Sequence, residues 1–179
     1  MKTPEKILIN AVTNFYWCCV NNDLTNAKKL YIEYSFNNNV INKAFIKSCE
    51  KSRRPILKFL LDKGADINVD NNYAIKRAVM RRDIRMLMLM RVYGAYVDAN
   101  SSELIGYASY NGDLNIVKYL VACGVDVCAD DNLAIKLAIR GNQPDVFRYL
   151  WNNGSRCVAL QNETFRLFHY LLDTHIRFY

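Results

Sequence analysis

Apolar and small residues recur along this chain with the spacing of one helical face. In the segment 72–81 such residues follow the i, i+1, i+4, i+5 pattern of a helix that buries one side: Ala74, Ile75, Ala78 and Val79. The segment 114–123 has a comparable face, and a polar turn at 82–83 precedes another helix predicted over 84–93. The pattern therefore predicts pairs of short helices, with Asn72 as the N-cap of the first helix in its pair.

The helix pairs repeat with a period of 30 residues. Four glycines recur at this step, and each is expected to end the second helix of a pair in the left-handed conformation: Gly64, Gly94, Gly124 and Gly154. Small residues at the same step are expected to let the first helices approach closely: Ala78, Ala108 and Ala138. One such pair cannot bury its apolar faces alone, so neighbouring pairs must stack.

The fold class that follows is an all-α solenoid of stacked helix-turn-helix repeats, in a single domain over residues 1–179. The repeats are predicted at about 12–41, 42–71, 72–101, 102–131, 132–161 and 162–179, and the first and last of these are expected to act as caps.

Two segments resemble the ankyrin repeat family. They are the end-of-repeat sequence Lys58-Phe59-Leu60-Leu61-Asp62-Lys63-Gly64-Ala65-Asp66-Ile67-Asn68, and Asn111-Gly112-Asp113-Leu114-Asn115-Ile116-Val117-Lys118-Tyr119-Leu120-Val121, which is similar to the inter-helix turn and second helix. The usual Thr-Pro-Leu-His opening is replaced by Tyr73-Ala74-Ile75-Lys76, and the period is 30 rather than about 33 residues. The missing residues fall where ankyrin repeats extend a β-hairpin finger, so the resemblance implies shortened loops. This variant is similar to the ankyrin repeats of giant DNA viruses of the mimivirus type.

Composition excludes several classes of protein. Hydrophobic residues make up 51% of the chain, with only 7 Gly and 3 Pro, which is unlike a disordered chain or an all-β fold rich in turns. No apolar run is long enough for a membrane span, and six cysteines without a signal peptide are typical of free thiols in a reducing compartment. We therefore expect a cytoplasmic protein, in the host cytoplasm if it is viral. The net charge of +7 permits an acidic partner or nucleic acid.

Residues that could carry catalysis or bind a metal are sparse, and we expect no enzyme activity, metal or cofactor. His169 and His175 have no Cys or Glu at metal-ligand spacing, and Cys123 and Cys128 do not form a CxxC pair. Cys18-Cys19 has no His placed to activate a thiolate. Two repeated aspartates, Asp66 and Asp126, are better explained by hydrogen bonding within a turn.

Four methionines in one repeat allow two interpretations: Met80, Met86, Met88 and Met90. They could belong to a helix buried on several sides, which is the favoured interpretation, or form an adaptable apolar patch for a partner or a second copy.

The ankyrin resemblance implies that the first helices line a concave, protein-binding face. The positions that would face it define the inner strip: Lys47, Glu50, Lys51, Arg77, Met80, Arg81, Tyr107, Tyr110, Asn111, Leu137, Arg140 and Gly141. Five basic groups and two tyrosines suit an acidic protein segment, bound by a monomer. Nucleic acid is a less favoured ligand of the same strip, because Lys and Arg are spread through the chain. A ubiquitin-ligase adaptor, for which nothing after residue 162 resembles a box motif, and a structural or decoy protein remain alternatives.

Overall fold

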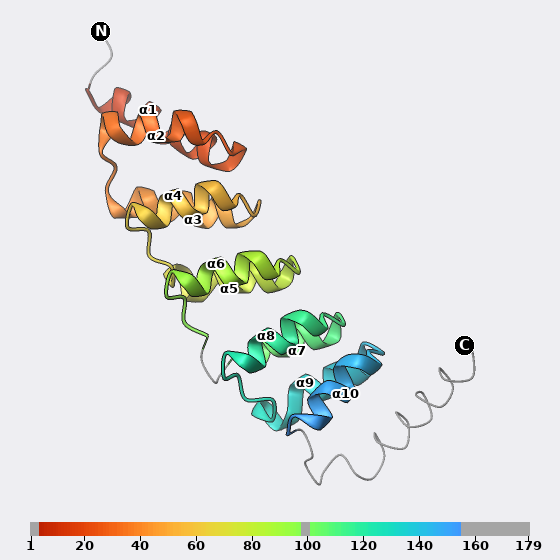
Figure 1. Cartoon of the computed structure of the whole chain (residues 1–179). Helices are drawn as coiled ribbons and strands as arrows, with labels where there is room; N and C mark the ends of the chain where they lie inside the picture. Colours follow the sequence, from red (N-terminus) through yellow and green to blue (C-terminus); the bar gives the residue numbers. More distant parts are fainter. Residues whose placement is uncertain (1–3, 98–100, 155–179) are drawn as a thin grey trace. The chain divides into compact units, whose positions relative to one another are not determined.

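Helices account for all the regular structure in residues 4–97 and 101–154, which are the residues that the computed structural model describes (Figure 1). The chain divides into two compact units, Met1–Tyr96 and Val97–Tyr179. The first unit contains α1 (Pro4–Asn21), α2 (Leu24–Tyr34), α3 (Asn38–Cys49), α4 (Arg54–Asp62), α5 (Val69–Met80) and α6 (Ile84–Val92). The second contains α7 (Ser102–Tyr110), α8 (Leu114–Ala122), α9 (Ala129–Arg140) and α10 (Pro144–Asn152). The expected all-α fold of stacked helix pairs is confirmed.

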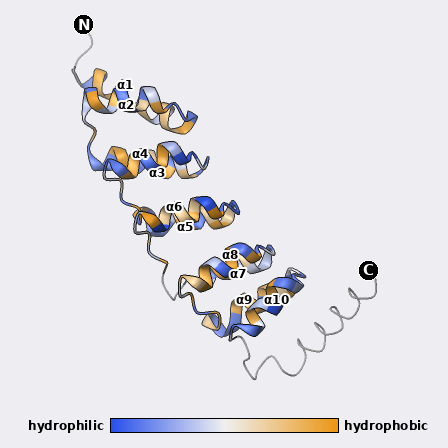
Figure 2. Ribbon diagram, viewed as in Figure 1, coloured by the Kyte–Doolittle hydropathy of each residue, from blue (hydrophilic) through white to orange (hydrophobic). Residues whose placement is uncertain are grey.

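In the first unit, α1, α3 and α5 pack in series and each packs against its own partner, α2, α4 or α6. Apolar residues recur in each of the helices α1 to α10 (Figure 2). The largest fully buried side chains of this unit come from both members of the pairs: Phe15, Phe45, Ile41, Ile56, Leu57, Leu60, Ile75, Met86, Leu87 and Met90. Stacking therefore buries the faces that the helical spacing predicts.

In the second unit, α7 packs closely on α9, while α8 and α10 pack against their partners. Two of the small residues predicted at the 30-residue step, Ala108 and Ala138, are fully buried, as Ala78 is in the first unit. A Cβ added at Gly141 would lie only 2.1 Å from the Tyr110 carbonyl oxygen. The absence of a side chain at Gly141 is therefore what allows the turns after α7 and α9 to approach each other.

The predicted helix stops are confirmed. The four glycines at the 30-residue step have φ of 89°, 82°, 92° and 124°, in the order Gly64, Gly94, Gly124 and Gly154. A second set of left-handed residues at the same step lies in the turn inside each helix pair, and its members are Asn22, Ser52, Arg82, Gly112 and Asn142. Asp23 and Asp83 follow two of these residues, and their side chains cap α2 and α6 by accepting hydrogen bonds from the backbone N–H of Asn26 and Met86.

The prediction that Asn72 caps its helix is wrong. Asn72 is the last of three consecutive left-handed residues, Asp70, Asn71 and Asn72, within α5, a conformation unlike the extended backbone of an N-cap, and Asn68, which precedes α5, makes no side-chain cap hydrogen bond. The same left-handed segment recurs at 130–132 in α9. Asp and Asn tolerate positive φ better than other residues with a Cβ, so three of them in a row can reverse the chain in a short loop. No strand stands in the described loops, in agreement with the expected absence of full β-hairpin fingers.

The single domain and its six repeat boundaries stay a prediction. The segment 162–179, predicted as the C-terminal cap, lies outside the described residues, as do Cys157, His169 and His175.

Candidate functional site

The first unit carries the basic part of the inner strip, on α3, α5 and the turns that follow them. Lys47, Lys51 and Arg81 are exposed, and Arg77 is half-buried. Met80 keeps 49% of its surface accessible and is the only apolar member of this set. The first unit therefore offers cationic groups around one accessible apolar side chain.

Arg81 has a structural role that its place in the sequence does not reveal. Its Nε donates a hydrogen bond to Ser52 Oγ at 3.0 Å, and its Nη1 donates to the Glu50 carbonyl oxygen at 3.0 Å. Both acceptors lie 29 to 31 residues earlier, in the turn of the preceding helix pair. Arg81 thus joins two stacked turns through two of its N–H donors.

Arg77 also sits among groups of the neighbouring helix pair. Its Nε is buried and has no hydrogen-bond partner. Burial raises the pKa of the Tyr73 hydroxyl, nearby Glu50 raises it further, and Arg77 acts in the opposite direction. The Tyr73 hydroxyl donates to Glu50 Oε1 at 3.4 Å, so the one acid of the strip is already engaged. Part of the Arg77 guanidinium group is therefore shielded from solvent.

The second unit carries the aromatic part of the inner strip. Tyr107 and Tyr110 lie on α7 with 39% and 46% of their surface accessible. Arg140, at the end of α9, is exposed, whereas Asn111 is half-buried and its Nδ2 donates to the Tyr107 carbonyl oxygen at 3.0 Å. The two tyrosine rings are the accessible side chains here with the size and polarity of interface anchors.

Four arginines that the sequence interpretation left out lie beside the basic part of the strip: Arg53, Arg54, Arg82 and Arg85. Their signal was visible in two short basic runs, residues 51–54 and 81–85. The described part of the first unit, residues 4–97, contains 16 Lys and Arg against 8 Asp and Glu, whereas residues 101–154 contain 4 against 6. Positive charge is therefore concentrated in the first unit rather than spread evenly.

The cysteines of the described ranges are free thiols, and three of them, Cys18, Cys19 and Cys49, are buried. Burial raises the pKa of Cys19 to about 12 and that of Cys49 to about 12, so both thiols stay protonated near neutral pH. In the same ranges, no three His, Cys, Asp or Glu side chains gather as a metal-ion site would require. A hollow beside Trp17 and Asp23 lies between α1 and α2, away from the inner strip.

The remaining sequence interpretations have mixed outcomes. Local hydrogen bonding explains the two aspartates, because Asp66 Oδ1 accepts from Asn68 N at 2.9 Å and Asp126 Oδ1 from Cys128 N at 2.8 Å. The four methionines are divided: Met86 and Met90 are fully buried, as the favoured interpretation expects, whereas Met80 and Met88 are half exposed. A binding role for the two exposed methionines stays a prediction.

Comparison with known proteins agrees with this geometry. The family described as ankyrin repeats (three copies) matches residues 75–162. A putative ankyrin repeat protein of Acanthamoeba polyphaga mimivirus is 28% identical over 111 residues, covering 62% of this chain and 24% of the relative. A second from the same virus is 30% identical over 146 residues, covering 79% of this chain and 24% of the relative. The chain is an ankyrin repeat protein. It resembles those of mimivirus, and it spans about a quarter of the length of these two relatives.

Ankyrin repeats are generally protein–protein interaction modules, and the family is known as a non-enzymatic interaction fold. None of the helices in residues 4–97 and 101–154 combines the length and the hydropathy that a transmembrane span requires.

Proposed function

We propose that this ankyrin repeat chain is a non-enzymatic module that binds an acidic protein segment, as a monomer, through the inner strip. The observation that carries the proposal is the chemistry of the strip: exposed Lys47, Lys51 and Arg81 on the first unit, and accessible Tyr107 and Tyr110 on the second. Positive charges on the protein speed the encounter with an acidic partner, and aromatic anchors slow its dissociation. The partner is proposed to be a viral or host-cell protein in the host cytoplasm.

The proposal assigns different roles to the two units. Lys47 and Arg140 are exposed on α3 and α9 and lie at the charged positions of the strip. Both are suited to test it, because neither takes part in the turn contacts that involve Arg81. Reversing both charges removes attraction for an acidic segment while the helix pairs retain their buried faces.

The experiment compares two double variants with the same change in net charge. Lys47→Glu with Arg140→Glu alters the inner strip, whereas Lys58→Glu with Arg148→Glu alters exposed positions on α4 and α10. Each immobilised protein captures partners from a lysate of Acanthamoeba, with and without nuclease treatment, and captured proteins are identified and then titrated individually. We expect the strip variant to bind tenfold or more weakly, about the effect of losing one interface anchor, while the control stays near the unmodified protein.

Equal binding by both variants, with the fold intact by circular dichroism, would contradict the assignment to the inner strip. Capture that disappears on nuclease treatment would instead support nucleic acid as the ligand, with a steep dependence on salt.

A further inference from the structure

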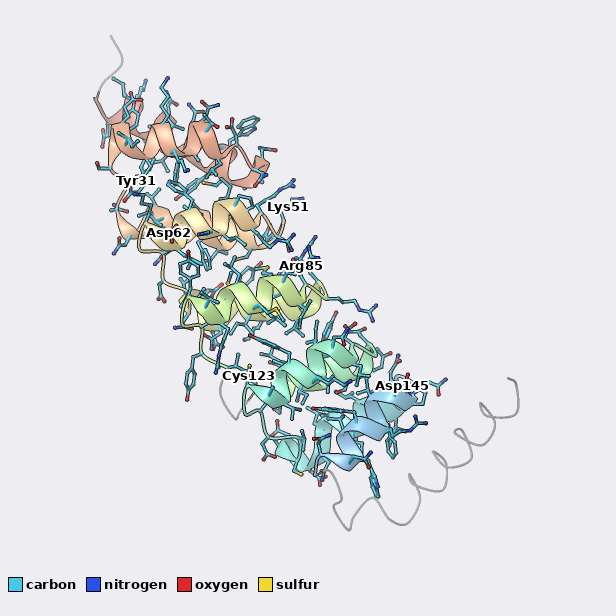
Figure 3. The ribbon with its side chains drawn as sticks, in the orientation of Figure 1. Tyr31, Lys51, Asp62, Arg85, Cys123 and Asp145 are labelled. Carbon is cyan, nitrogen blue, oxygen red and sulfur yellow. The ribbon has the colours of Figure 1, made fainter. Side chains whose placement is uncertain are left out.

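Six cationic side chains gather on two consecutive turns of the first unit. This basic turn cluster consists of Lys51, Arg53 and Arg54, at the turn between α3 and α4, and Arg81, Arg82 and Arg85, at the turn between α5 and α6. Arg54 Nη1 lies 3.3 Å from Asp83 Oδ1, and Arg81 donates to Ser52 Oγ and to the Glu50 carbonyl, so the two turns are in direct contact. Figure 3 shows Lys51 and Arg85 at the same end of their helix pairs, away from the end at which Asp62 lies.

Two acids beside this cluster already have partners. Asp83 receives the Arg54 contact and also caps α6 through Met86 N, and Glu50 accepts from Tyr73. Residues 50–54 and 81–85 together contain these two acids and six Lys or Arg. The corresponding turns at 21–23, 111–113 and 141–143 contain no Lys or Arg, so the positive charge is confined to two neighbouring turns.

The backbone at Arg82 provides a separate observation. Arg82 has φ of 57° at a position where the other turns have Asn22, Ser52, Gly112 or Asn142. A residue with a long side chain is unfavourable in this left-handed conformation, which Gly, Asn and Asp adopt more readily. Backbone preference at this turn therefore does not by itself favour arginine.

Met80 indicates which kind of polyanion fits. It ends α5, directly before Arg81, and half of its surface is accessible. A phosphate backbone offers nothing apolar to such a side chain, whereas a peptide offers both carboxylates and apolar groups. Guanidinium forks pair with carboxylates in bidentate geometry, and methionine adapts to differently shaped apolar partners.

We propose that the basic turn cluster, together with Met80, is the docking site for a protein segment in which acidic residues flank an apolar side chain. This inference rests on the proposed function and narrows it, because it moves the main charged contact from the inner helices of both units to two turns of the first. The inner strip then contributes through Lys51 and Arg81, which it shares with the cluster.

The test uses synthetic probes and the whole chain. The first probe is a labelled peptide of repeated Glu-Glu-Leu triplets, the second replaces every Leu by Ser, and the third is oligothymidine of equal total charge. The cluster variant combines Lys51→Gln, Arg53→Gln and Arg85→Gln, which spares Arg54 and Arg81 because these hold the turns together. The control variant combines Lys28→Gln, Lys43→Gln and Lys58→Gln, exposed positions on α2, α3 and α4 with the same change in charge.

We expect the cluster variant to bind the Glu-Glu-Leu peptide at least tenfold more weakly than the unmodified protein, and the control variant to lose less than about threefold. Met80→Gln should lower affinity for the Leu peptide and leave the Ser peptide unaffected. Equal losses in cluster and control variants, tighter binding of oligothymidine than of peptide, or no measurable peptide binding would each overturn the inference.

The proposed function can survive failure of this inference. If Lys47→Glu with Arg140→Glu abolishes peptide binding while the cluster variant binds normally, the inner strip binds the acidic segment and the cluster does not. If both variants bind the peptide as the control does, the acidic segment binds at neither surface, and the inference and the proposed function fail together.

Discussion

Replacing Gly141 by alanine tests the closest approach between helix pairs in the second unit. A Cβ at Gly141 would lie 2.1 Å from the Tyr110 carbonyl oxygen and 2.9 Å from its carbonyl carbon. The carbonyl would have to withdraw by about 1 Å to restore a van der Waals contact. It also accepts a hydrogen bond from Gln143 Nε2 at 3.3 Å, which this movement would lengthen.

The expected change in the free energy of unfolding follows from two opposing terms. Overpacking against backbone costs about 1–3 kcal/mol. Alanine recovers about 0.4–1 kcal/mol by restricting the unfolded chain, because the φ of Gly141 is −81° and suits a residue with a Cβ. We therefore expect a net destabilisation of about 1–2 kcal/mol, or a fall in Tm of about 2–8 °C for a chain of this size.

The assay is thermal unfolding followed by far-ultraviolet circular dichroism, with Gly106→Ala as the matched control. A Cβ at Gly106 would meet Leu137 Cδ1 at 2.9 Å, the movable end of a side chain rather than backbone. Gly106 lies inside α7, so alanine there should leave Tm unchanged or raise it. The free energy of unfolding should increase by at most about 1 kcal/mol. A Tm for Gly141→Ala at or above that of the unmodified protein would show that the two turns are not in contact.

Three further predictions concern stability. Burial raises the pKa of Cys19 and Cys49 to about 12, so the unfolded chain loses these protons first, and above about pH 8.5 the free energy of unfolding should fall by about 1.4 kcal/mol per pH unit for each thiol. Urea titrations at several alkaline pH values measure this free energy of unfolding. It should fall less steeply with pH in the double variant Cys19→Ala with Cys49→Ala than in the unmodified protein. Arg81→Ala removes the bond to Ser52 and should destabilise the protein by about 1–2 kcal/mol, and an unchanged urea midpoint would contradict the role of Arg81. Asp66→Ala should cost about 0.5–1.5 kcal/mol in thermal unfolding, and Asp66→Asn, which keeps the acceptor, should cost less.

The fold was predictable because its determinants are local. A helical face depends on spacing within one turn or two, and a left-handed stop depends on the residue that occupies it, so Gly64 and Gly124 could be assigned from the sequence. The small residues at the 30-residue step were predictable for a related reason, since only small side chains fit between closely packed helices. Ala78, one of these residues, is fully buried.

The Asn72 prediction failed because two local rules compete. Asn favours an N-cap, but it also tolerates positive φ, and the helical pattern does not show which property the short loop uses. The structure uses the second property at Asn72 and again at Asn132, each of which is the last of three consecutive left-handed residues.

The basic turn cluster was missed for a different reason. Arg54 and Asp83 are 29 residues apart in the sequence, and only stacking places their turns side by side. The charge of each turn could be counted from the sequence. The hydrogen bonds that join Arg81 to the preceding turn could not be predicted from it.

The sequence by itself determined the repeat, the helix pairs and the residues at which helices end, because these follow from side-chain periodicity and backbone preference within each repeat. The tertiary structure decided which charges lie together, which thiols are buried and which glycine faces a carbonyl group, because these depend on residues about 30 positions apart that only the packing of one helix pair on the next brings into contact.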